Sequence, residues 1–458
     1  MVEAFLKRRP LGPLTPAVLS FVWPGLGQLA IGKRREAALL AIPAAILVLA
    51  ILSRLVGRLE LAAVTMLDPA FAGFVFFAAV ALAGWRSIAV IDAWRSEVPM
   101  PANLRARQWL AGLLIAIALS HAVVGYYAWA FYDAGSQIFT GDGPSPSPPA
   151  PTPTLAPGET PAPPTPTPGP TAPPSDRISI LLTGIDSGHD RRHALTDTML
   201  VISVSPSKGT VAMVSFPRDL ADFQLYSGGT FHDKLNALRT TAALNPTRFP
   251  DGPDQTLANQ LGYFLGIRIE YTAAINLIGF ERMINLVGGV DIVNERAIND
   301  PVYDWFDGTY GFRLSAGAHH LNGRNALAYV RSRMGAGDND FTRANRQQQL
   351  ILALKDKLAS PATLARLPEL LDAAGNTVKT NVPPDKAHDY VELADSIDPA
   401  NITRVVLGPP YAFHPPTNTT GGIYILRLNE EKIAALAVEL FGTDTRYFGA
   451  VASPSPTR

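Results

Sequence analysis

The sequence has no cysteine and no excess of charge of either sign. Its 458 residues include 39 Lys and Arg and 39 Asp and Glu, so the formal net charge is zero. The absence of cysteine excludes disulfides, zinc–thiolate sites and thiol catalysis. The balanced charge argues against a nucleic-acid partner, for which a basic face is expected. The length allows two or three domains with a core of ample size.

Long hydrophobic runs are concentrated in residues 1–133, which we interpret as a membrane region. The runs at 37–56, 61–85 and 109–131 are each long enough to cross a hydrocarbon core of roughly 30 Å as a helix. The carboxylate of Asp68 interrupts the second run. We place it near the outer interface, because a carboxylate at the centre of a membrane helix costs roughly 2.5–3.5 kcal/mol.

A further apolar stretch, at 15–31, is broken by proline and glycine and has basic clusters on both sides. Because basic flanks prefer the cytoplasmic side, we favour a segment that enters the membrane and returns, with a full crossing as the alternative. In both cases the arginine-rich loop at 86–107 is cytoplasmic and the chain after 109–131 lies outside the cell. No cleavable signal is evident. We therefore predict a multi-pass cell-membrane protein with an extracytoplasmic domain.

Residues 134–176 are predicted to be a disordered linker, since 143–174 consist almost wholly of Pro, Thr, Ser, Ala and Gly. Such a composition cannot bury a core and favours extended polyproline II. At roughly 3.1 Å per residue it can hold the next domain up to about 100 Å from its anchor. That domain is expected over 177–443, followed by a C-terminal tail at 444–458.

The sequence pattern after the linker predicts an α/β domain, with a mixed β-sheet layered between helices. Apolar runs typical of strands and amphipathic stretches typical of helices follow one another there. We expect strands at 178–184, 198–205, 210–216, 271–276, 290–294 and 403–408, and helices at 254–265, 277–287, 322–330 and 341–358.

Two aspartates, Asp186 and Asp197, each adjoin an apolar run typical of a buried strand. Ligands of α/β sheets are held at strand ends, so these carboxylates are predicted to bind a divalent cation, Mg²⁺ or Mn²⁺. Aspartates that cap turns are the alternative. The strand at 210–216 ends in a similar way, with Arg218 and Asp219 at its exit.

Four arginines lie within sixteen residues near the end of this pattern. Arg331 and Arg333 are two apart and would point the same way on an extended segment, while Arg343, Arg346 and Gln347 share one face of a helix. The planar fork of arginine suits bidentate contact with phosphate. A solvated face or ion pairs with nearby aspartates would be the ordinary explanation for any one arginine. As a set with the metal-binding carboxylates, these side chains predict a site that handles phosphate.

Nine short motifs occur in a fixed order between about residues 177 and 360. They are Gly184-Ile-Asp186, Thr196-Asp-Thr198, Ser215-Phe-Pro-Arg-Asp219, Lys234-Leu-Asn236, Gly279-Phe280, Gly288-Gly-Val-Asp291, Leu321-Asn-Gly323, Ala326-Leu-Ala-Tyr-Val-Arg-Ser-Arg333 and Asp340-Phe-Thr-Arg-Ala-Asn-Arg-Gln347. In this order they resemble the LytR-CpsA-Psr family. The resemblance covers roughly two fifths of the chain.

The resemblance implies a membrane-anchored phosphotransferase of the cell envelope. Such an enzyme moves a glycopolymer, such as teichoic acid, capsule or arabinogalactan, from a polyprenyl-pyrophosphate carrier to peptidoglycan. The implied fold is a mixed sheet between helical layers whose interior accepts the prenyl chain. The implied partners are the carrier-linked glycopolymer, the peptidoglycan acceptor and the lipid bilayer.

Residue roles follow from the charge that develops when an anhydride is broken, because catalysis of such a transfer rests on placement and preset positive charge. Arg218 is expected to neutralise the anhydride, and Asp219 either to hold Arg218, which we favour, or to orient the acceptor hydroxyl. Lys234 is a further phosphate contact by resemblance. Arg346 and Asp340 are assigned to substrate binding, and Arg331, Arg333, Arg343 and Gln347 join Arg218 and Asp219 as catalytic residues.

Two other functions remain open. The same site could act as a hydrolase that releases the polymer or recycles the carrier, and only the products distinguish the two reactions. A non-catalytic envelope module that binds anionic polymer or carrier lipid is the other alternative. The paired aspartates argue against it, because simple anion binding gains nothing from paired carboxylates. A covalent serine intermediate is disfavoured, since no nucleophile elbow or Ser-His-Asp order occurs.

Overall fold

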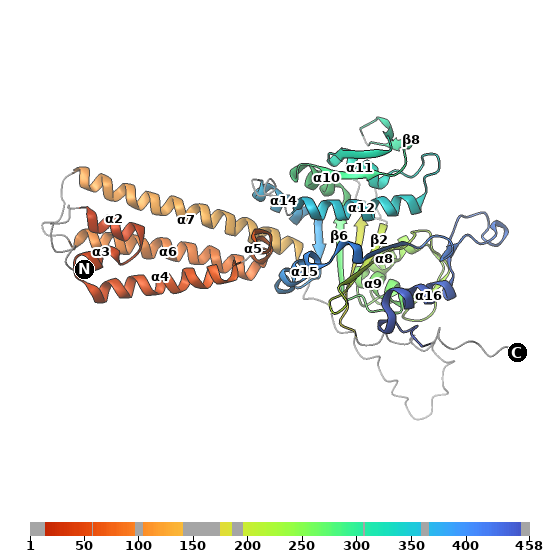
Figure 1. Cartoon of the computed structure of the whole chain (residues 1–458), viewed down its shortest axis with the longest axis horizontal. Coiled ribbons are helices and arrows are strands. Elements are labelled where there is room, and N and C mark those ends of the chain that lie inside the picture. The colour runs from red at the N-terminus through yellow and green to blue at the C-terminus, as the bar shows by residue number, and fades with distance from the viewer. Residues whose placement is uncertain are drawn as a thin grey trace, which may run out of the picture. The chain divides into compact units, whose positions relative to one another are not determined.

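The computed structural model describes residues 14–56, 58–96, 104–140, 175–185, 196–305, 307–358 and 366–449. The chain divides into two compact units, Met1–Ser136 and Gln137–Arg458 (Figure 1). Three predicted features, namely Asp186, the Pro-rich stretch 143–174 and the end of the tail from residue 450, lie outside the described residues.

The first unit is helical. Among its described residues, three helices are long and apolar enough to cross a membrane, in agreement with the number of predicted runs. Its helices are α2 (Thr15–Val22), α3 (Leu26–Ala30), α4 (Arg34–Arg54), α5 (Leu59–Met66), α6 (Pro69–Arg95) and α7 (Leu104–Ile138), of which α4, α6 and α7 are the three long ones.

The second membrane run was placed wrongly by the sequence pattern. The predicted crossing at 61–85 is divided between α5 and α6, because the chain breaks at Asp68. The Asp68 carboxylate accepts a hydrogen bond of 2.9 Å from the backbone N–H of Ala70 and so caps the N-terminus of α6, which runs on to Arg95. Asp68 is a helix boundary residue, as expected, but the long helix starts after it.

The stretch 15–31 forms two helices of eight and five residues, each too short to cross a bilayer. A buried polar network joins it to α6. The Ser20 hydroxyl donates to Gln28 Oε1 at 2.9 Å, and Gln28 Nε2 donates to the carbonyl of Ala89 and to Asp92 Oδ2, both at 2.9 Å. Gly27 permits the close packing, because a Cβ there would lie 2.0 Å from the Pro16 carbonyl.

The second unit is built on a mixed six-stranded sheet with the order β11-β6-β1-β2-β3-β12, which confirms the predicted fold class. The central pairs β1–β2 and β2–β3 are antiparallel, while β6 and β12 run parallel to β1 and β3 respectively. The strands are β1 (Ile178–Ile185), β2 (Thr196–Ser205), β3 (Thr210–Ser215), β6 (Tyr271–Asn276), β11 (Val378–Thr380) and β12 (Ile402–Val406).

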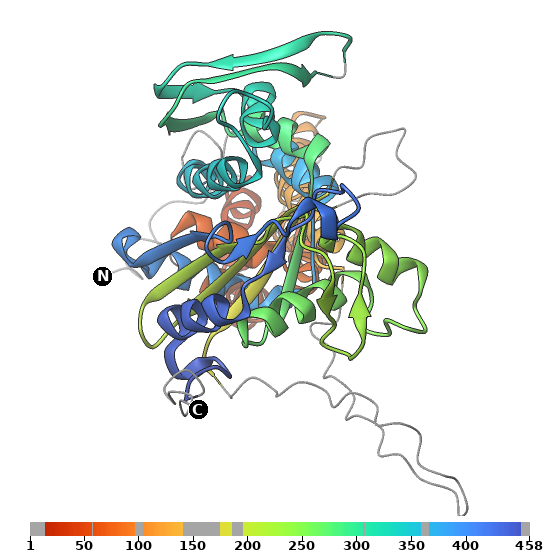
Figure 2. The same ribbon diagram turned by 90° about the vertical axis from the view of Figure 1, so that its right-hand side faces the viewer.

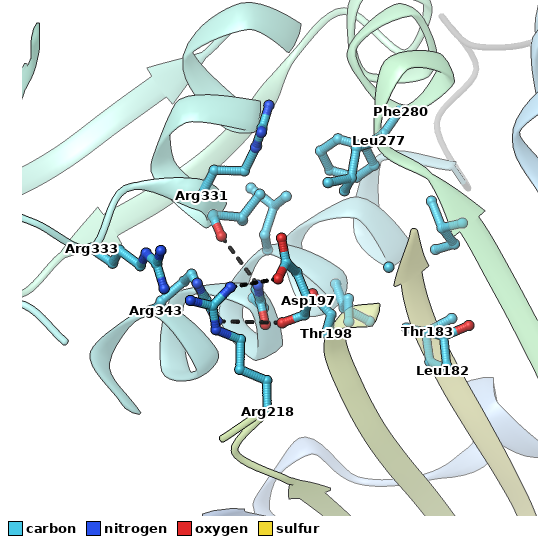
Figure 3. A pocket seen from close by; sticks show the side chains of 16 residues that line it. Leu182, Thr183, Asp197, Thr198, Arg218, Leu277, Phe280, Arg331, Arg333 and Arg343 are labelled. Carbon is cyan, nitrogen blue, oxygen red and sulfur yellow. Dashed lines mark hydrogen bonds and ion pairs between the residues drawn. The ribbon is translucent and has the colours of Figure 1, made fainter. Parts of the chain in front are cut away.

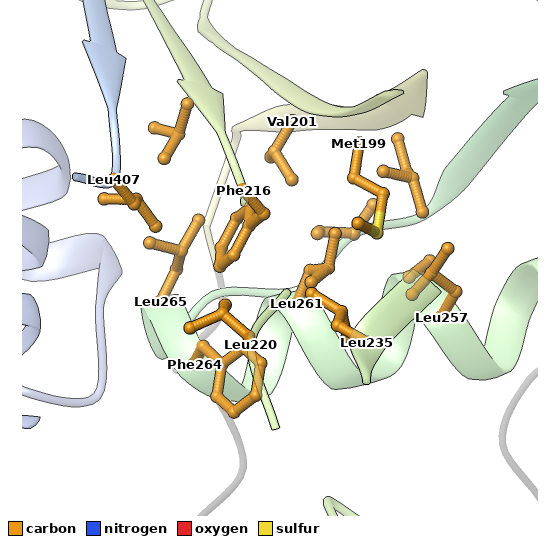
Figure 4. Packing of buried hydrophobic residues seen from close by; sticks show 14 of the residues in the cluster. Met199, Val201, Phe216, Leu220, Leu235, Leu257, Leu261, Phe264, Leu265 and Leu407 are labelled. Atoms are coloured by element: carbon orange, nitrogen blue, oxygen red, sulfur yellow. The ribbon is translucent and has the colours of Figure 1, made fainter. Parts of the chain in front are cut away.

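Helices cover both faces of this sheet (Figures 1 and 2). Successive side chains of a strand point to opposite faces, so Met199 and Val201 pack against the helices on one face and Leu200 against those on the other. Figure 4 shows the hydrophobic core on the face that carries Met199 and Val201. The first face carries α8 (Leu235–Leu244), α9 (Pro253–Leu265) and α16 (Glu430–Phe441), and the second carries α10 (Leu277–Leu286), α11 (Gly323–Arg331) and α12 (Asp340–Leu358).

Outside α10 and α11 lies a pair of antiparallel two-stranded sheets that the sequence pattern only partly anticipated. The predicted strand at 290–294 exists, but it pairs with a strand outside the main sheet. The sheets are formed by β7 (Val290–Asn294) with β10 (Gly317–Leu321) and by β8 (Ile298–Asp304) with β9 (Tyr310–Leu314). Their buried residues share a core with α10, α11 and α12.

The remaining elements close the domain. Four short strands form two antiparallel pairs, β4 with β5 and β13 with β14. The packed chain also extends into the predicted tail, because the Thr445 hydroxyl donates to the Leu265 carbonyl at 2.9 Å and the Arg446 guanidinium stacks on Tyr263. These elements are β4 (Phe223–Gln224), β5 (Thr230–Phe231), α14 (Leu367–Thr377), α15 (Pro384–Ser396), β13 (Ala412–Phe413) and β14 (Arg427–Leu428), with short 3-10 turns at Pro399–Asn401, Thr417–Thr419 and Gly442–Asp444.

Two leucines of α8 test the assigned core. Leu238 is fully buried beneath the sheet and Leu244 is 65% exposed. Leu238→Ala is expected to lower the free energy of unfolding by about 2–5 kcal/mol, because the cavity left behind cannot fully close. Leu244→Ala should change it by less than about 0.5 kcal/mol. Thermal unfolding of the whole chain in detergent micelles compares them, and equal unfolding midpoints would contradict this packing.

Candidate functional site

A cavity of about 190 Å³ lies where β1 and β2 meet α11 and α12 (Figure 3). Its two sides differ in chemistry. One side is polar and is lined by Asp197, Thr198, Arg218, Arg331, Arg333, Arg343 and Gln347. The other is mainly apolar and is lined by Leu182, Ile275, Leu277, Phe280, Val330, Leu350 and Ile351, with Thr183 and Gly184 at the strand edge. The described lining is therefore amphipathic.

Three parts of the chain bring the arginines to this cavity. Arg218 follows the end of β3, Arg331 is the last residue of α11, Arg333 lies two residues further on, and Arg343 is in the first turn of α12. The expectation that Arg331 and Arg333 share an extended segment is wrong, because helix α11 includes Arg331 and the chain becomes extended only at Ser332. Both side chains nevertheless line the cavity.

Ion pairs link the arginines to two aspartates. Arg218 Nη1 lies 2.7 Å from Asp197 Oδ1. Asp340 Oδ1 lies 3.0 Å from Arg343 Nη2 and 3.5 Å from Arg333 Nη1, and Asp340 Oδ2 lies 4.0 Å from Arg218 Nε. Figure 3 shows Arg218, Arg333 and Arg343 converging beside Asp197. Since the described cavity lining has four arginines and one aspartate, it favours an anion.

Burial affects the pKa and the hydrogen bonding of two of these guanidiniums, those of Arg343 and Arg218. Burial lowers the pKa of Arg343, which is 6% exposed, against the opposing effect of Asp340. Burial also acts to lower the pKa of Arg218, but the carboxylates of Asp197, Asp340 and Asp219 outweigh it and raise this pKa overall. The Nε atoms of Arg218 and Arg343 are buried without a hydrogen-bond partner in the described part of the chain. Such donors gain most from an anion that enters the cavity.

Gln347 and Arg346 hold α12 against α11. Gln347 lines the cavity and its Nε2 donates to the Val330 carbonyl at 3.1 Å. Arg346 is buried outside the cavity lining, where Nη1 pairs with Asp338 Oδ2 at 3.2 Å and Nη2 donates to the Ser332 carbonyl. Its position gives no support to the predicted contact with substrate. Arg346 instead fixes the loop between the two helices.

Asp219 and Lys234 pair with each other at the edge of the site. Lys234 Nζ lies 2.5 Å from Asp219 Oδ1, and Asp219 Oδ2 lies 3.7 Å from Arg218 Nε. Neither side chain is among those lining the cavity. This geometry agrees with the expectation that Asp219 holds Arg218 in place. The contact of Lys234 with phosphate stays a prediction.

The expected metal site is only partly described. Ile185, the residue before Asp186, pairs across β1 and β2 with Thr196, the residue before Asp197. Among the residues that the structure describes, no group of three or more His, Asp or Glu could hold a metal ion. The oxygen of Asp197 suits a hard cation, which commonly takes only one or two protein carboxylates beside substrate phosphate. The Asp197 carboxylate also pairs with Arg218, so a cation there would share it.

Sequence reasoning missed Asp300, which positions Arg333 from β8. Its carboxylate is 1% exposed, and Oδ2 accepts hydrogen bonds from Ser332 Oγ at 2.8 Å, from the Arg333 N–H at 3.1 Å and from the Met334 N–H at 3.1 Å. A buried carboxylate needs such partners, and here they fix the first residues after α11. No local sequence pattern predicts this contact, because the hydrogen-bond partners of Asp300 are 32 to 34 residues away.

Residues 165–441 match the model of the LytR_cpsA_psr family. A protein named polyisoprenyl-teichoic acid–peptidoglycan teichoic acid transferase TagU, from Halalkalibacterium halodurans, is 28% identical over 269 residues, which are 58% of this chain and 78% of that protein. The TagV transferase of Bacillus subtilis, named in the same way, is 31% identical over 210 residues, which are 44% of this chain and 49% of that protein.

Solved structures with a similar arrangement include a crystal structure of B. subtilis TagV, at 24% identity and a TM-score of 0.45, covering 58% of this chain and 97% of that chain. A structure of TagT bound to LIIa-WTA, at 24% identity and a TM-score of 0.44, covers 59% of this chain and 91% of that chain.

Asp300→Asn tests the positioning of Arg333. The amide cannot replace both acceptor oxygens, because Oδ1 accepts from the Val302 N–H at 3.3 Å while Oδ2 serves three donors. The affinity of the cavity for inorganic pyrophosphate, measured by titration calorimetry, is expected to fall by about tenfold, or about 1.4 kcal/mol. Asp307→Asn is the matched control, since Asp307 pairs with Arg324 on the surface. Equal affinities in the two variants would contradict this role.

Proposed function

This chain belongs to the LytR_cpsA_psr family, and from that premise we propose that it transfers a phosphate-linked glycopolymer from a polyprenyl-pyrophosphate carrier to peptidoglycan. The names of the TagU and TagV relatives support the proposal. The observation that carries it is the cavity, which joins an apolar side to a cluster of arginines. A lipid-linked pyrophosphate has the same two-part chemistry.

The apolar side suits the prenyl chain. Leu182 and Ile275 come from neighbouring strands, Phe280 from α10, and Leu350 and Ile351 from α12, so hydrocarbon surrounds this part of the cavity on several sides. Burial of apolar surface contributes roughly 25 cal/mol per Å². A few isoprene units in the cavity therefore stabilise the complex and hold the pyrophosphate at the arginine side.

The arginine side suits the anhydride. A unit charge pair 4 Å apart is worth about 1 kcal/mol in water but about 4 kcal/mol at an effective dielectric constant near 20. The burial of Arg218 and Arg343 therefore increases what each guanidinium contributes as charge develops on the leaving phosphate. Arg331 and Arg333 line the same cavity and complete the cluster.

The transfer exchanges one phosphorus–oxygen bond for another. The acceptor hydroxyl attacks the phosphorus that carries the glycopolymer, the anhydride bond breaks, polyprenyl phosphate leaves, and the hydroxyl proton is released. The chain's own residues place the pyrophosphate and neutralise it. Asp197 orients Arg218 through their ion pair, while Asp340 orients Arg343 and Arg333.

A divalent cation, Mg²⁺ or Mn²⁺, is part of this proposal. Asp197, together with Asp186, would hold it beside the substrate's phosphate oxygens. Such an ion supplies positive charge to the phosphoryl oxygens. The ion pair of Asp197 with Arg218 keeps the same carboxylate in place.

The proposal also places the protein in the membrane. We infer that α4, α6 and α7, which are long and apolar enough, span the bilayer and that the second unit works outside the cytoplasm. The arginines at 86, 95, 105 and 107 favour a cytoplasmic position for the connection between α6 and α7. The lipid carrier and the peptidoglycan acceptor are then reachable from the same side.

Arg343→Ala is expected to reduce turnover of the lipid pyrophosphate by about 10²–10³-fold, the range seen when one charge-stabilising donor is removed from an active site. Release of polyprenyl phosphate from a purified lipid pyrophosphate measures it. Arg268→Ala is the control, because Arg268 is an exposed arginine of the same unit. Unchanged turnover in Arg343→Ala, with the unfolding midpoint also unchanged, would exclude the proposed mechanism.

Chelation of divalent cations is expected to suppress turnover, and added Mg²⁺ should restore it, because Asp197 supplies a cation ligand. Asp197→Asn should weaken the Mg²⁺ dependence. Asp254→Asn is a matched control, since Asp254 pairs with Arg239 at the same 2.7 Å. Product analysis with and without a glycan acceptor separates transfer from hydrolysis, while carrier binding that survives chelation without any turnover would favour the non-catalytic alternative.

A further inference from the structure

The chain that leads from β13 to β14 forms an arm whose base is bonded to the segment after β3. We call residues 412–426 the acceptor arm. The Leu426 N–H donates to the Asp219 carbonyl at 2.8 Å, and the Ala221 N–H donates to the Leu426 carbonyl at 2.9 Å. Because Asp219 follows Arg218 directly, these backbone bonds attach the arm beside the arginine cluster.

The acceptor arm exposes large apolar side chains to solvent. Phe413 is 45% exposed, Tyr424 is 50% exposed and Ile423 is 61% exposed. The rings of His414 and Tyr424 lie 4.8 Å apart at an angle of 33°, and His414 Nδ1 is 2.8 Å from the Ile425 carbonyl, so the two rings are held together. The paired rings of His414 and Tyr424 form one exposed surface on the arm, and exposed apolar surface is typical of an interaction site.

The Tyr424 hydroxyl lies within the electrostatic influence of the site. Burial raises the pKa of Tyr424, and the negative charges of Asp219 and Asp340 raise it further. Asp340 bonds Arg343 and Asp219 lies against Arg218. Leu426, two residues after Tyr424, bonds the backbone of Asp219, so this end of the arm lies at the arginine side of the site.

The composition of the arm indicates the chemistry of its ligand. Residues 412–426 contain no Lys, Arg, Asp or Glu, and their sequence combines aromatic residues with the hydroxyl and amide residues 417–420. The absence of charge does not suit a phosphate-rich or strongly charged partner. A sugar ring has an apolar face of C–H groups and a rim of hydroxyls, so it stacks on an aromatic ring and accepts polar contacts at its edge.

We propose that the acceptor arm binds the sugar rings of the glycan that receives the polymer. This inference rests on the proposed function, in which a glycan hydroxyl must reach the phosphorus beside Arg218. Tyr424, whose ring lies against His414, provides the stacking surface, and the backbone bonds of Leu426 attach the arm beside Arg218. The donor lipid and the acceptor glycan then enter the site over different residues.

The test measures binding of a neutral oligosaccharide to the full chain in detergent micelles. The probe is the tetramer of β-1,4-linked N-acetylglucosamine, and titration calorimetry gives its dissociation constant. Tyr424→Ala is expected to weaken binding by about tenfold, because the ring that stacks on the sugar is lost. Tyr424→Phe, which keeps the ring, should stay within about threefold of the unchanged chain. Tyr310→Ala is the matched control, since Tyr310 is an exposed aromatic of β9.

Equal affinities for Tyr424→Ala and the Tyr310→Ala control would overturn this inference, as would absence of tetramer binding to the unchanged chain. Either result leaves the proposed function standing if the chain still releases polyprenyl phosphate from the lipid pyrophosphate. Tetramer binding that depends on Tyr424, in a chain without that turnover, would support this inference and contradict the proposed function.

Discussion

The charge balance around Arg218 is the constraint on which the site depends. Four guanidiniums line one small cavity, and they would repel one another without the carboxylates of Asp197 and Asp340 between them. Because there are four guanidiniums and two carboxylates, the cluster keeps a net positive charge. An entering pyrophosphate neutralises that charge, so the arrangement is stable when empty and more stable when occupied.

The fold supplies the rigidity that this cluster requires. The loop between α11 and α12 presents Arg333, and it is held from two sides by buried groups. Asp300 accepts two of its backbone N–H groups, and Arg346 donates to the Ser332 carbonyl. These contacts fix a loop that would otherwise be free to move, and a catalytic group gains from such fixed placement.

The sequence predicted more of the sheet than of its surroundings. The strands β1, β2, β3 and β6 were placed within two residues, because each is an apolar run bounded by turn residues. The break at Asp68 was underestimated, since hydropathy measures composition and ignores the helix cap that the carboxylate forms with Ala70. Short strands such as β13 and β14 carry no periodic signal, so the arm they support could not be foreseen.

The sequence by itself determined which chemistry is present: long apolar helices, a mixed α/β domain, and aspartates and arginines in a family-specific order. Composition and local periodicity depend on neighbouring residues only, so they survive in the linear chain. The tertiary structure decided which of those side chains meet. It placed Arg343 in the cavity, where Nη2 donates to the carbonyl of Asp197, 146 residues away. It placed Arg346, three residues later, in a buried ion pair with Asp338 of the loop before α12. Such contacts form only when the chain folds, so the local sequence pattern cannot tell the two arginines apart.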